Sequence, residues 1–135
     1  MEITVTQEKG KVPVSVVHIE GELDTSNYSE LVNTAQALYS AGARSLLLDL
    51  TDLKFISSAG IASFHIITKM FRGEKAAPED VWDTVKKIDR NHESRLQKRV
   101  KLLNPSSEAD CVLDILGFKK FFDIYTDLEE AIASF

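Results

Sequence analysis

Apolar and polar residues alternate in the first two segments of the chain. The alternation covers residues 3–8 and resumes over residues 12–21, after a turn-forming stretch at residues 9–11. This pattern predicts an antiparallel β-hairpin. Pro13 should lie at the start of the second strand, because proline cannot donate a hydrogen bond to a strand ladder, and Gly21 should end that strand.

The apolar spacing then changes to the three-and-four spacing of a helix with one buried face. We expect this helix to begin near Thr25, to be capped by Asp24, Thr25 or Ser26, and to stop at residues 41–42. Residues 46–50 follow and are apolar on both faces. That composition is typical of a strand in the middle of a covered sheet.

A strand, a helix and a strand in this order predict a parallel βαβ unit with a right-handed crossover. Residues 14–19 and 46–50 should therefore pair in parallel, which makes the fold α/β. Ser57 and Ser58 then offer capping hydroxyls, and a second helix should begin near Ser58. Its helical stripe comprises Ile61, Phe64, Ile67, Thr68 and Phe71.

Residues 74–98 differ from the rest of the chain in their high charge. Twelve of these twenty-five residues are Asp, Glu, Lys or Arg. We interpret them as an inserted, mostly exposed helix that begins near Pro78 and precedes a short strand at residues 100–103. Trp82, within this insertion, either anchors a partner or covers the domain's own core.

The C-terminal part continues the alternation of helices and strands. The pattern predicts a helix capped by Ser106 or Ser107 and closed by Gly117, a strand at residues 121–125 and a last helix at residues 127–133. The whole chain is thus expected to form one α/β domain, with a mixed, mostly parallel sheet flanked by helices.

The composition is that of a globular protein. The chain has 135 residues, of which 44% are hydrophobic and 27% charged, enough to bury a core without disulfides or metal. It lacks an apolar stretch of about 18 residues and the layout of a secretory signal, so we expect a cytoplasmic protein without direct membrane insertion. The net charge of −5 gives no general attraction to nucleic acid.

The residues that could carry chemistry form no known catalytic pattern. The sequence contains no phosphate-binding glycine motif, no G-x-S-x-G elbow and no His or Cys spacing for a metal. We therefore expect no enzyme activity, no metal and no cofactor. His18 and His65 are interpreted as part-buried structural residues, and Cys111 as a small core side chain.

Four acidic residues require separate consideration. Glu22 with Asp24, and Asp49 with Asp52, come at the ends of successive parallel strands and could together hold Mg²⁺. Helix capping by Asp24 and a turn at Asp52 explain these residues more simply. All four carboxylates should cluster at one edge of the sheet.

The sequence LLLDLTDLKFISSAGIA at residues 46–62 resembles the core signature of the STAS domain, the family of bacterial anti-sigma factor antagonists. Further resemblance lies in GELD at residues 21–24, VKLLNP at 100–105 and LGF at 116–118. The resemblance implies a docking module that is phosphorylated on a serine at the start of the second main helix. That serine is Ser58 here, with Ser57 as the alternative.

The resemblance also implies the partners. The unphosphorylated form would bind a serine-kinase anti-sigma factor and so free the sigma factor, and a serine phosphatase would reset the cycle. Asp24 would contact a basic residue of the kinase, and Gly60 would permit close approach of backbone or partner. The expected contact surface comprises Glu22, Asp24, Thr25, Asn27, Ser57, Ala59, Gly60 and Ile61.

Elementary electrostatics supports the same site. Free N–H groups and the positive end of the helix dipole favour a phosphate at a helix start, while the added charge of about −2 would repel a partner. Two alternatives remain open. One is an accessory subunit of a membrane transporter or stress-signalling scaffold whose serine is never modified, and the other is a metal enzyme that uses the carboxylate pairs.

Overall fold

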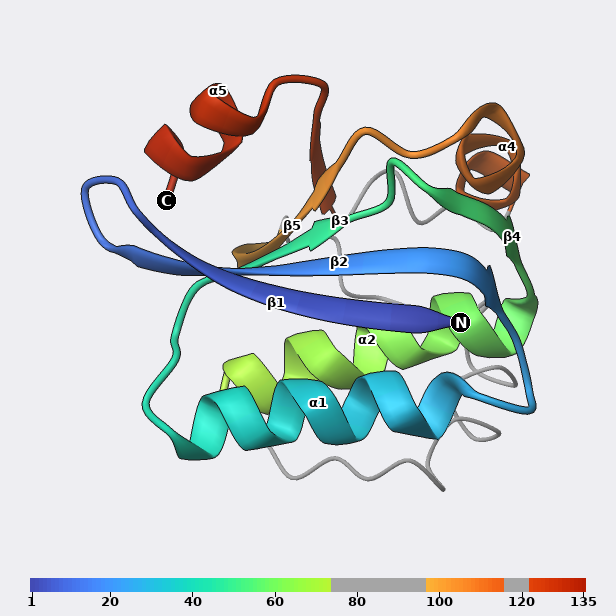
Figure 1. The fold of residues 1–135 in the computed structure, drawn as a ribbon, viewed down its shortest axis with the longest axis horizontal. Coiled ribbons are helices and arrows are strands. Elements are labelled where there is room, and N and C mark those ends of the chain that lie inside the picture. The colour runs from blue at the N-terminus through green and yellow to red at the C-terminus, as the bar shows by residue number, and fades with distance from the viewer. Residues whose placement is uncertain (74–96, 116–121) are drawn as a thin grey trace.

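The computed structural model describes residues 1–73, 97–115 and 122–135 (Figure 1). Its strands form one sheet in the order β1-β2-β3-β5-β6, with β4 paired to β2 off this path. In chain order the elements are β1 (Glu2–Lys9), β2 (Pro13–Leu23), α1 (Tyr28–Ser40), β3 (Leu46–Asp49), β4 (Leu53–Ile56), α2 (Ser58–Phe71), β5 (Gln97–Leu103), α4 (Ser107–Ile115), β6 (Phe122–Tyr125) and α5 (Leu128–Ala133).

The sheet confirms the expected hairpin and the expected parallel core. Strands β1 and β2 are antiparallel, with Ile3 opposite Ile19. Strands β2, β3, β5 and β6 pair in parallel, and β3 lies between β2 and β5. The prediction that β2 ends at Gly21 is wrong. Gly21 has a φ of 99° and marks a register shift, so the strand passes through a bulge and continues to Leu23.

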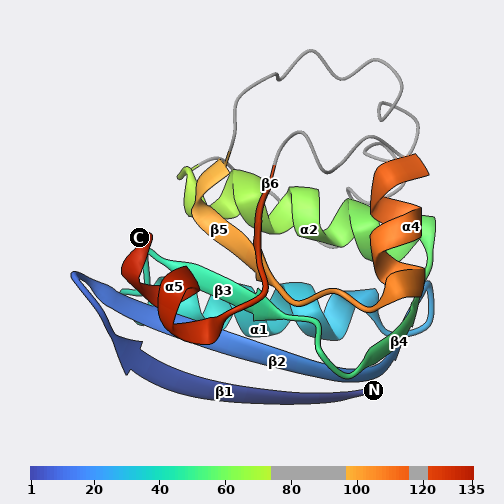
Figure 2. The same cartoon turned by 90° about the horizontal axis from the view of Figure 1, so that it is seen from above.

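Helices cover both faces of the sheet. Helices α1 and α2 lie side by side against one face, and α5 lies on the opposite face (Figures 1 and 2). Alternation along β2 explains this division, because Val17 and Ile19 join the main core under α1 and α2, whereas Val14 and Val16 join a smaller cluster that includes Ala131 of α5. The α/β class with a mixed, mostly parallel sheet is therefore confirmed.

Helix α1 begins three residues later than expected, and Asp24 does not cap it. The backbone N–H groups of Asn27 and Tyr28 donate to the Asp24 carbonyl, and the Asp24 carboxylate accepts from the N–H and hydroxyl of Ser26. Residues 24–27 therefore form a turn, and the capping position falls on Asn27 rather than on Asp24, Thr25 or Ser26.

Strand β4 was not expected. Its four residues have the burial order buried, exposed, exposed, buried, so they show no alternation. The strand forms because it pairs with β2 beyond the bulge at Gly21. It carries the chain directly into α2.

The C-terminal elements agree with the sequence analysis, except that β5 begins at Gln97, three residues earlier than expected, and that one cysteine is misplaced. Ser106 caps α4 by accepting from the Ala109 N–H, and Asp127 caps α5. Cys111 is exposed, so its assignment to the core is wrong. None of the described helices is long and apolar enough to cross a lipid bilayer. Residues 74–96 of the expected insertion, with Pro78 and Trp82, and the helix stop at Gly117 lie outside the described residues, whereas residues 97 and 98 belong to β5.

The first turn of α2 packs directly against the sheet at Gly60. A Cβ atom at this position would lie 2.9 Å from the Leu23 carbonyl oxygen and 2.8 Å from Cγ1 of Ile56. The close backbone approach that we expected at Gly60 is thus made within the protein. A side chain here would push α2 away from β2.

Replacing Gly60 by Ala should destabilise the protein by about 1–3 kcal/mol, because the backbone carbonyl of Leu23 cannot move aside cheaply. Glycine-to-alanine changes inside helices ordinarily stabilise by about 1 kcal/mol, so the sign is diagnostic. Denaturant unfolding measures the effect. Gln36→Ala, at an exposed position of α1, is the control and should change stability little. A stabilised Gly60→Ala variant would contradict the packing described here.

Candidate functional site

The two serines at the start of α2 have different environments. Ser57 is the capping residue: its hydroxyl accepts a hydrogen bond from the Gly60 N–H at 3.2 Å, and its own N–H donates to the Leu23 carbonyl at 2.9 Å. Ser58 is the first residue of the helix and is exposed. The structure therefore uses the Ser57 hydroxyl internally and leaves that of Ser58 at the surface.

The end of β2 and the turn that follows lie beside this helix start. Ser57 is hydrogen-bonded to Leu23, so Glu22 and Asp24, the two chain neighbours of Leu23, lie near the serines. Glu22 and Thr25 are exposed. Hydrogen bonds from the Ser26 hydroxyl and N–H lower the pKa of Asp24. The carboxylate therefore keeps its negative charge at neutral pH.

Asn27 holds this turn together. Its side-chain amide donates to the Glu22 carbonyl at 2.8 Å and accepts from the Asp24 N–H at 2.9 Å. Both ends of the amide are thus used within the turn. Asn27 fixes the positions of Glu22 and Asp24 rather than offering a free group to a partner.

Three of the expected contact residues lie inside the protein. Ala59, Gly60 and Ile61 are buried. The side chains of Ala59 and Ile61 belong to the main core. They support the surface from beneath. The expected residues with exposed or half-buried positions are Glu22, Asp24, Thr25, Asn27, Ser57 and Ser58.

Phe55 of β4 is a surface residue that the sequence analysis did not identify. Its side chain is 46% exposed, and it lies opposite the exposed Glu22 in the pairing of β2 with β4. Residues opposite each other in a sheet share a face. The sequence shows a phenylalanine two residues before Ser57. It does not show whether this ring is buried, because a strand of four residues is too short to reveal an alternation of faces.

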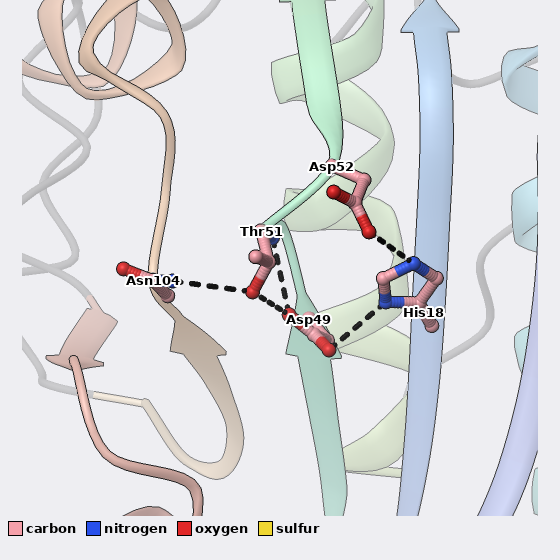
Figure 3. Close-up of polar contacts among 5 residues, drawn as sticks. All are labelled: His18, Asp49, Thr51, Asp52 and Asn104. Carbon is pink, nitrogen blue, oxygen red and sulfur yellow. Dashed lines mark hydrogen bonds and ion pairs between the residues drawn. The ribbon is translucent and has the colours of Figure 1, made fainter.

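A second polar cluster joins His18, in the middle of β2, to Asp49 at the end of β3 and to the loops after β3 and β5 (Figure 3). Nδ1 of His18 lies 2.9 Å from a carboxylate oxygen of Asp49, and Nε2 lies 3.0 Å from one of Asp52. The Thr51 hydroxyl donates to Asp49 at 2.6 Å and accepts from the Asn104 amide at 3.3 Å. His18 thus joins two carboxylates, and Thr51 extends the network to the loop after β5.

The electrostatics of this cluster favour a charged imidazolium. The hydrogen bond with Asp49 raises the pKa of His18, and the charges of both carboxylates add to this effect against the cost of burial. Partial burial opposes ionisation of Asp49, but hydrogen bonds from Thr51 and His18 outweigh it and lower its pKa. His18 is therefore a half-buried structural residue, as expected, and it compensates the nearby negative charge.

The two pairs of acidic residues have different partners. Asp52 comes just before β4 and Ser57 just after it, so a strand about 10 Å long separates these two residues. Asp49 and Asp52 bind His18, whereas Glu22 and Asp24 lie at the serine end. The described residues contain no group of three His, Cys, Asp or Glu side chains that could hold a metal ion.

Comparison with known proteins identifies the family. The sequence profile of the STAS domain matches residues 4–77, which is more than half of the chain, so this chain belongs to the STAS domain family. A comparison with curated proteins finds no match.

Solved structures of anti-sigma factor antagonists share the fold. A protein of Thermotoga maritima proposed to be such an antagonist has a TM-score of 0.68 and 15% identity, over 96% of this chain and 91% of that one. An antagonist from Mycobacterium paratuberculosis has a TM-score of 0.62 and 18% identity, over 98% and 93%. Phosphorylated SpoIIAA of Bacillus has a TM-score of 0.56 and 16% identity, over 97% and 96%. At identities this low, the structural similarity shows a common fold.

The paired carboxylates predict a pH-dependent contribution of His18 to stability. A raised histidine pKa stabilises the fold most at low pH, and this stabilisation is lost as the pH rises through the folded-state pKa. The lowered Asp49 pKa acts in the opposite direction, because its stabilisation is lost as the pH falls below the ordinary aspartate value. The contribution should therefore be largest between the ordinary values of 3.8 and 6.5.

Denaturant unfolding of His18→Gln at several pH values measures this contribution. The variant should lose about 1 kcal/mol or less relative to wild type within this window, and the loss should shrink at alkaline pH. Glu20→Gln, an exposed change on the same strand, is the control and should show no such pH dependence. A His18→Gln loss that stays constant or grows toward alkaline pH contradicts the imidazolium assignment.

Proposed function

We propose that this protein is an anti-sigma factor antagonist whose binding to a serine-kinase anti-sigma factor is switched off by phosphorylation of Ser58. The observation that carries the proposal is the exposed position of Ser58 at the start of a 14-residue helix, next to a serine whose hydroxyl is already used as the cap. Ser57 is the weaker candidate, because its modification would break the hydrogen bond to Gly60.

The helix start can accept a phosphate without refolding. The first N–H groups of a helix have no partner within the helix, and the dipole favours negative charge there. The first turn of α2 contains no acidic residue that would oppose the phosphate. The modification therefore changes the outer surface and leaves the packing of α2 on β2 intact.

The same modification would weaken docking. Glu22 and Asp24 already make the neighbouring surface acidic, and a phosphoserine adds about −2 charges. A partner packed against Ser58 must then separate from a dianion or desolvate it. A penalty of roughly 3 kcal/mol would reduce affinity about a hundredfold.

The proposed contact surface consists of Glu22, Asp24, Thr25, Phe55 and Ser58. The acidic residues favour a basic surface on the partner, and Phe55 favours an apolar pocket beside it. The fold similarity to anti-sigma factor antagonists supports this class of partner. SpoIIAA, which shares the fold, has been solved in unphosphorylated and phosphorylated forms.

The proposed cycle needs no catalytic step by this chain. The unphosphorylated protein binds the anti-sigma factor in the cytoplasm and frees the sigma factor. The kinase activity of the anti-sigma factor then modifies Ser58, and a serine phosphatase restores the hydroxyl. The chain acts as one binding domain over residues 1–135, including the residues inserted between α2 and β5.

Phosphorylation by candidate anti-sigma kinases with ATP tests the proposal directly. Mass spectrometry should place the phosphate on Ser58, Ser58→Ala should remain unmodified and bind constitutively, and Ser58→Asp should bind more weakly than wild type. Ser57→Ala is the matched control. It should still be phosphorylated while losing about 1 kcal/mol of stability with its cap. Modification at Ser57 alone, or none by a kinase that binds the protein, would exclude the proposed switch.

Phe55 should contribute directly to docking. Phe55→Ala is expected to weaken binding of the unphosphorylated protein to the kinase by about tenfold or more, because the ring is exposed and available to a partner pocket. Titration calorimetry measures the change. Val5→Ala, at a 38% exposed position of β1, should bind like wild type. Equal affinity of Phe55→Ala and wild type would remove Phe55 from the contact surface.

A further inference from the structure

A surface cavity of about 530 Å³, open to solvent on one side, lies at the opposite end of β2 from Ser58. It is lined by the β1–β2 hairpin, by Leu38 near the end of α1, by residues 41–45 and by Arg99 of β5. Ser15 in this lining is eight residues before Leu23, a separation of roughly 25 Å along an extended strand. The cavity is therefore separate from the proposed docking surface.

The charge of this cavity is opposite to that of the whole chain. The chain has 21 Asp and Glu against 16 Lys and Arg, giving a net charge of −5. Among the described residues that line the cavity, the charged ones are Arg44 and Arg99, and none is acidic. Two guanidinium groups without a carboxylate attract an anion.

Arg44 is held in place by its surroundings. Its Nη1 donates to the Tyr39 carbonyl at 3.0 Å and to the Ala43 carbonyl at 2.7 Å, and its guanidinium lies 3.9 Å from the centre of the Tyr39 ring. These contacts use one of its nitrogens and immobilise the side chain. A ligand that binds the other donors therefore needs to order little of this side chain.

Arg99 carries a charge that no described residue pairs with. It is exposed and makes no hydrogen bond or ion pair with any residue in the described part of the chain. The carbonyls that end α1 bring partial negative charge to the cavity, and Arg44 is bonded to them. Arg99 is thus the group whose charge is available in full to a ligand.

The remaining wall is largely apolar. Val12, Pro13 and Leu38 contribute hydrocarbon surface, and Val12 is 38% exposed. An apolar wall beside two guanidinium groups matches a molecule that has one anionic head and a short apolar body. Such a molecule would pair its head with the arginines and bury its body against these side chains.

We propose that this cavity binds a small organic carboxylate, with the head group on Arg44 and Arg99 and a short apolar body against Val12, Pro13 and Leu38. The proposal does not depend on phosphorylation of Ser58. It adds a ligand site at the end of the sheet that is distant from the proposed docking surface.

Amide NMR titration of the full chain with hexanoate tests the site. Hexanoate should give saturable shifts at Gly42, Ala43 and Ser45. Acetate has the carboxylate head but almost no apolar body, and hexan-1-ol has the apolar body but no charged head. Inorganic phosphate is an anion of a different kind. Each of these three should bind at least about tenfold more weakly than hexanoate. The proposal fails if hexanoate gives no saturable shifts at these amides, or if any of the three probes binds as tightly.

A charge variant separates a specific site from general attraction. Arg99→Gln should weaken hexanoate binding about tenfold while keeping the fold, because Arg99 has no partner among the described residues. Lys54→Gln removes one positive charge at an exposed position of β4 and is the matched control. Equal affinities of Arg99→Gln and wild type, or equal losses in both variants, would overturn the proposal.

Discussion

The contact between the first turn of α2 and the end of β2 determines where the functional surface lies. Gly60 lets the helix approach so closely that a Cβ atom would lie 2.9 Å from the Leu23 carbonyl, and the Ser57 N–H donates to that same carbonyl. These two interactions fix the rotation of the helix start. Ala59 and Ile61 consequently point into the core and Ser58 points outward. Exposure of a single hydroxyl thus follows from backbone packing.

The charges around β4 are divided between its two ends. At the start of the strand, His18 binds Asp49 and Asp52, and the Gly21 N–H donates to the Asp52 carbonyl. His18 thus compensates the charge of the carboxylates at this end and connects β2 to β3 and to the turn before β4. At the other end, the amino group of Met1 helps to lower the pKa of Asp24, but no side-chain cation among the described residues bonds Glu22 or Asp24. A change of charge at Ser58 therefore acts on a surface that carries two carboxylates. The division lets one part of the sheet edge stabilise the fold while the other remains available to a partner.

The sequence predicts those features that depend on local periodicity. The hairpin, the parallel βαβ unit and the start of α2 at Ser58 follow from alternation, helical spacing and capping residues. Features that depend on tertiary contacts were not predictable. Strand β4 exists because β2 continues past the bulge at Gly21. The later start of α1 follows from the turn that Asp24 forms with Ser26. Likewise, the pairing of His18 with two carboxylates requires β2 and β3 to be in register and the turn at Asp52 to lie beside β2.

A protein carrying phosphoserine at position 58, introduced during synthesis and therefore independent of any kinase, tests the central claim most directly. Amide NMR spectra and denaturant unfolding of this form are compared with those of the unmodified protein. We expect shift changes confined to the first turn of α2 and residues 22–27, with a free energy of unfolding within about 1 kcal/mol of the unmodified value. Shift changes throughout the core, or a loss of several kcal/mol, would contradict the account, because the phosphate would then disturb the packing of α2 on β2.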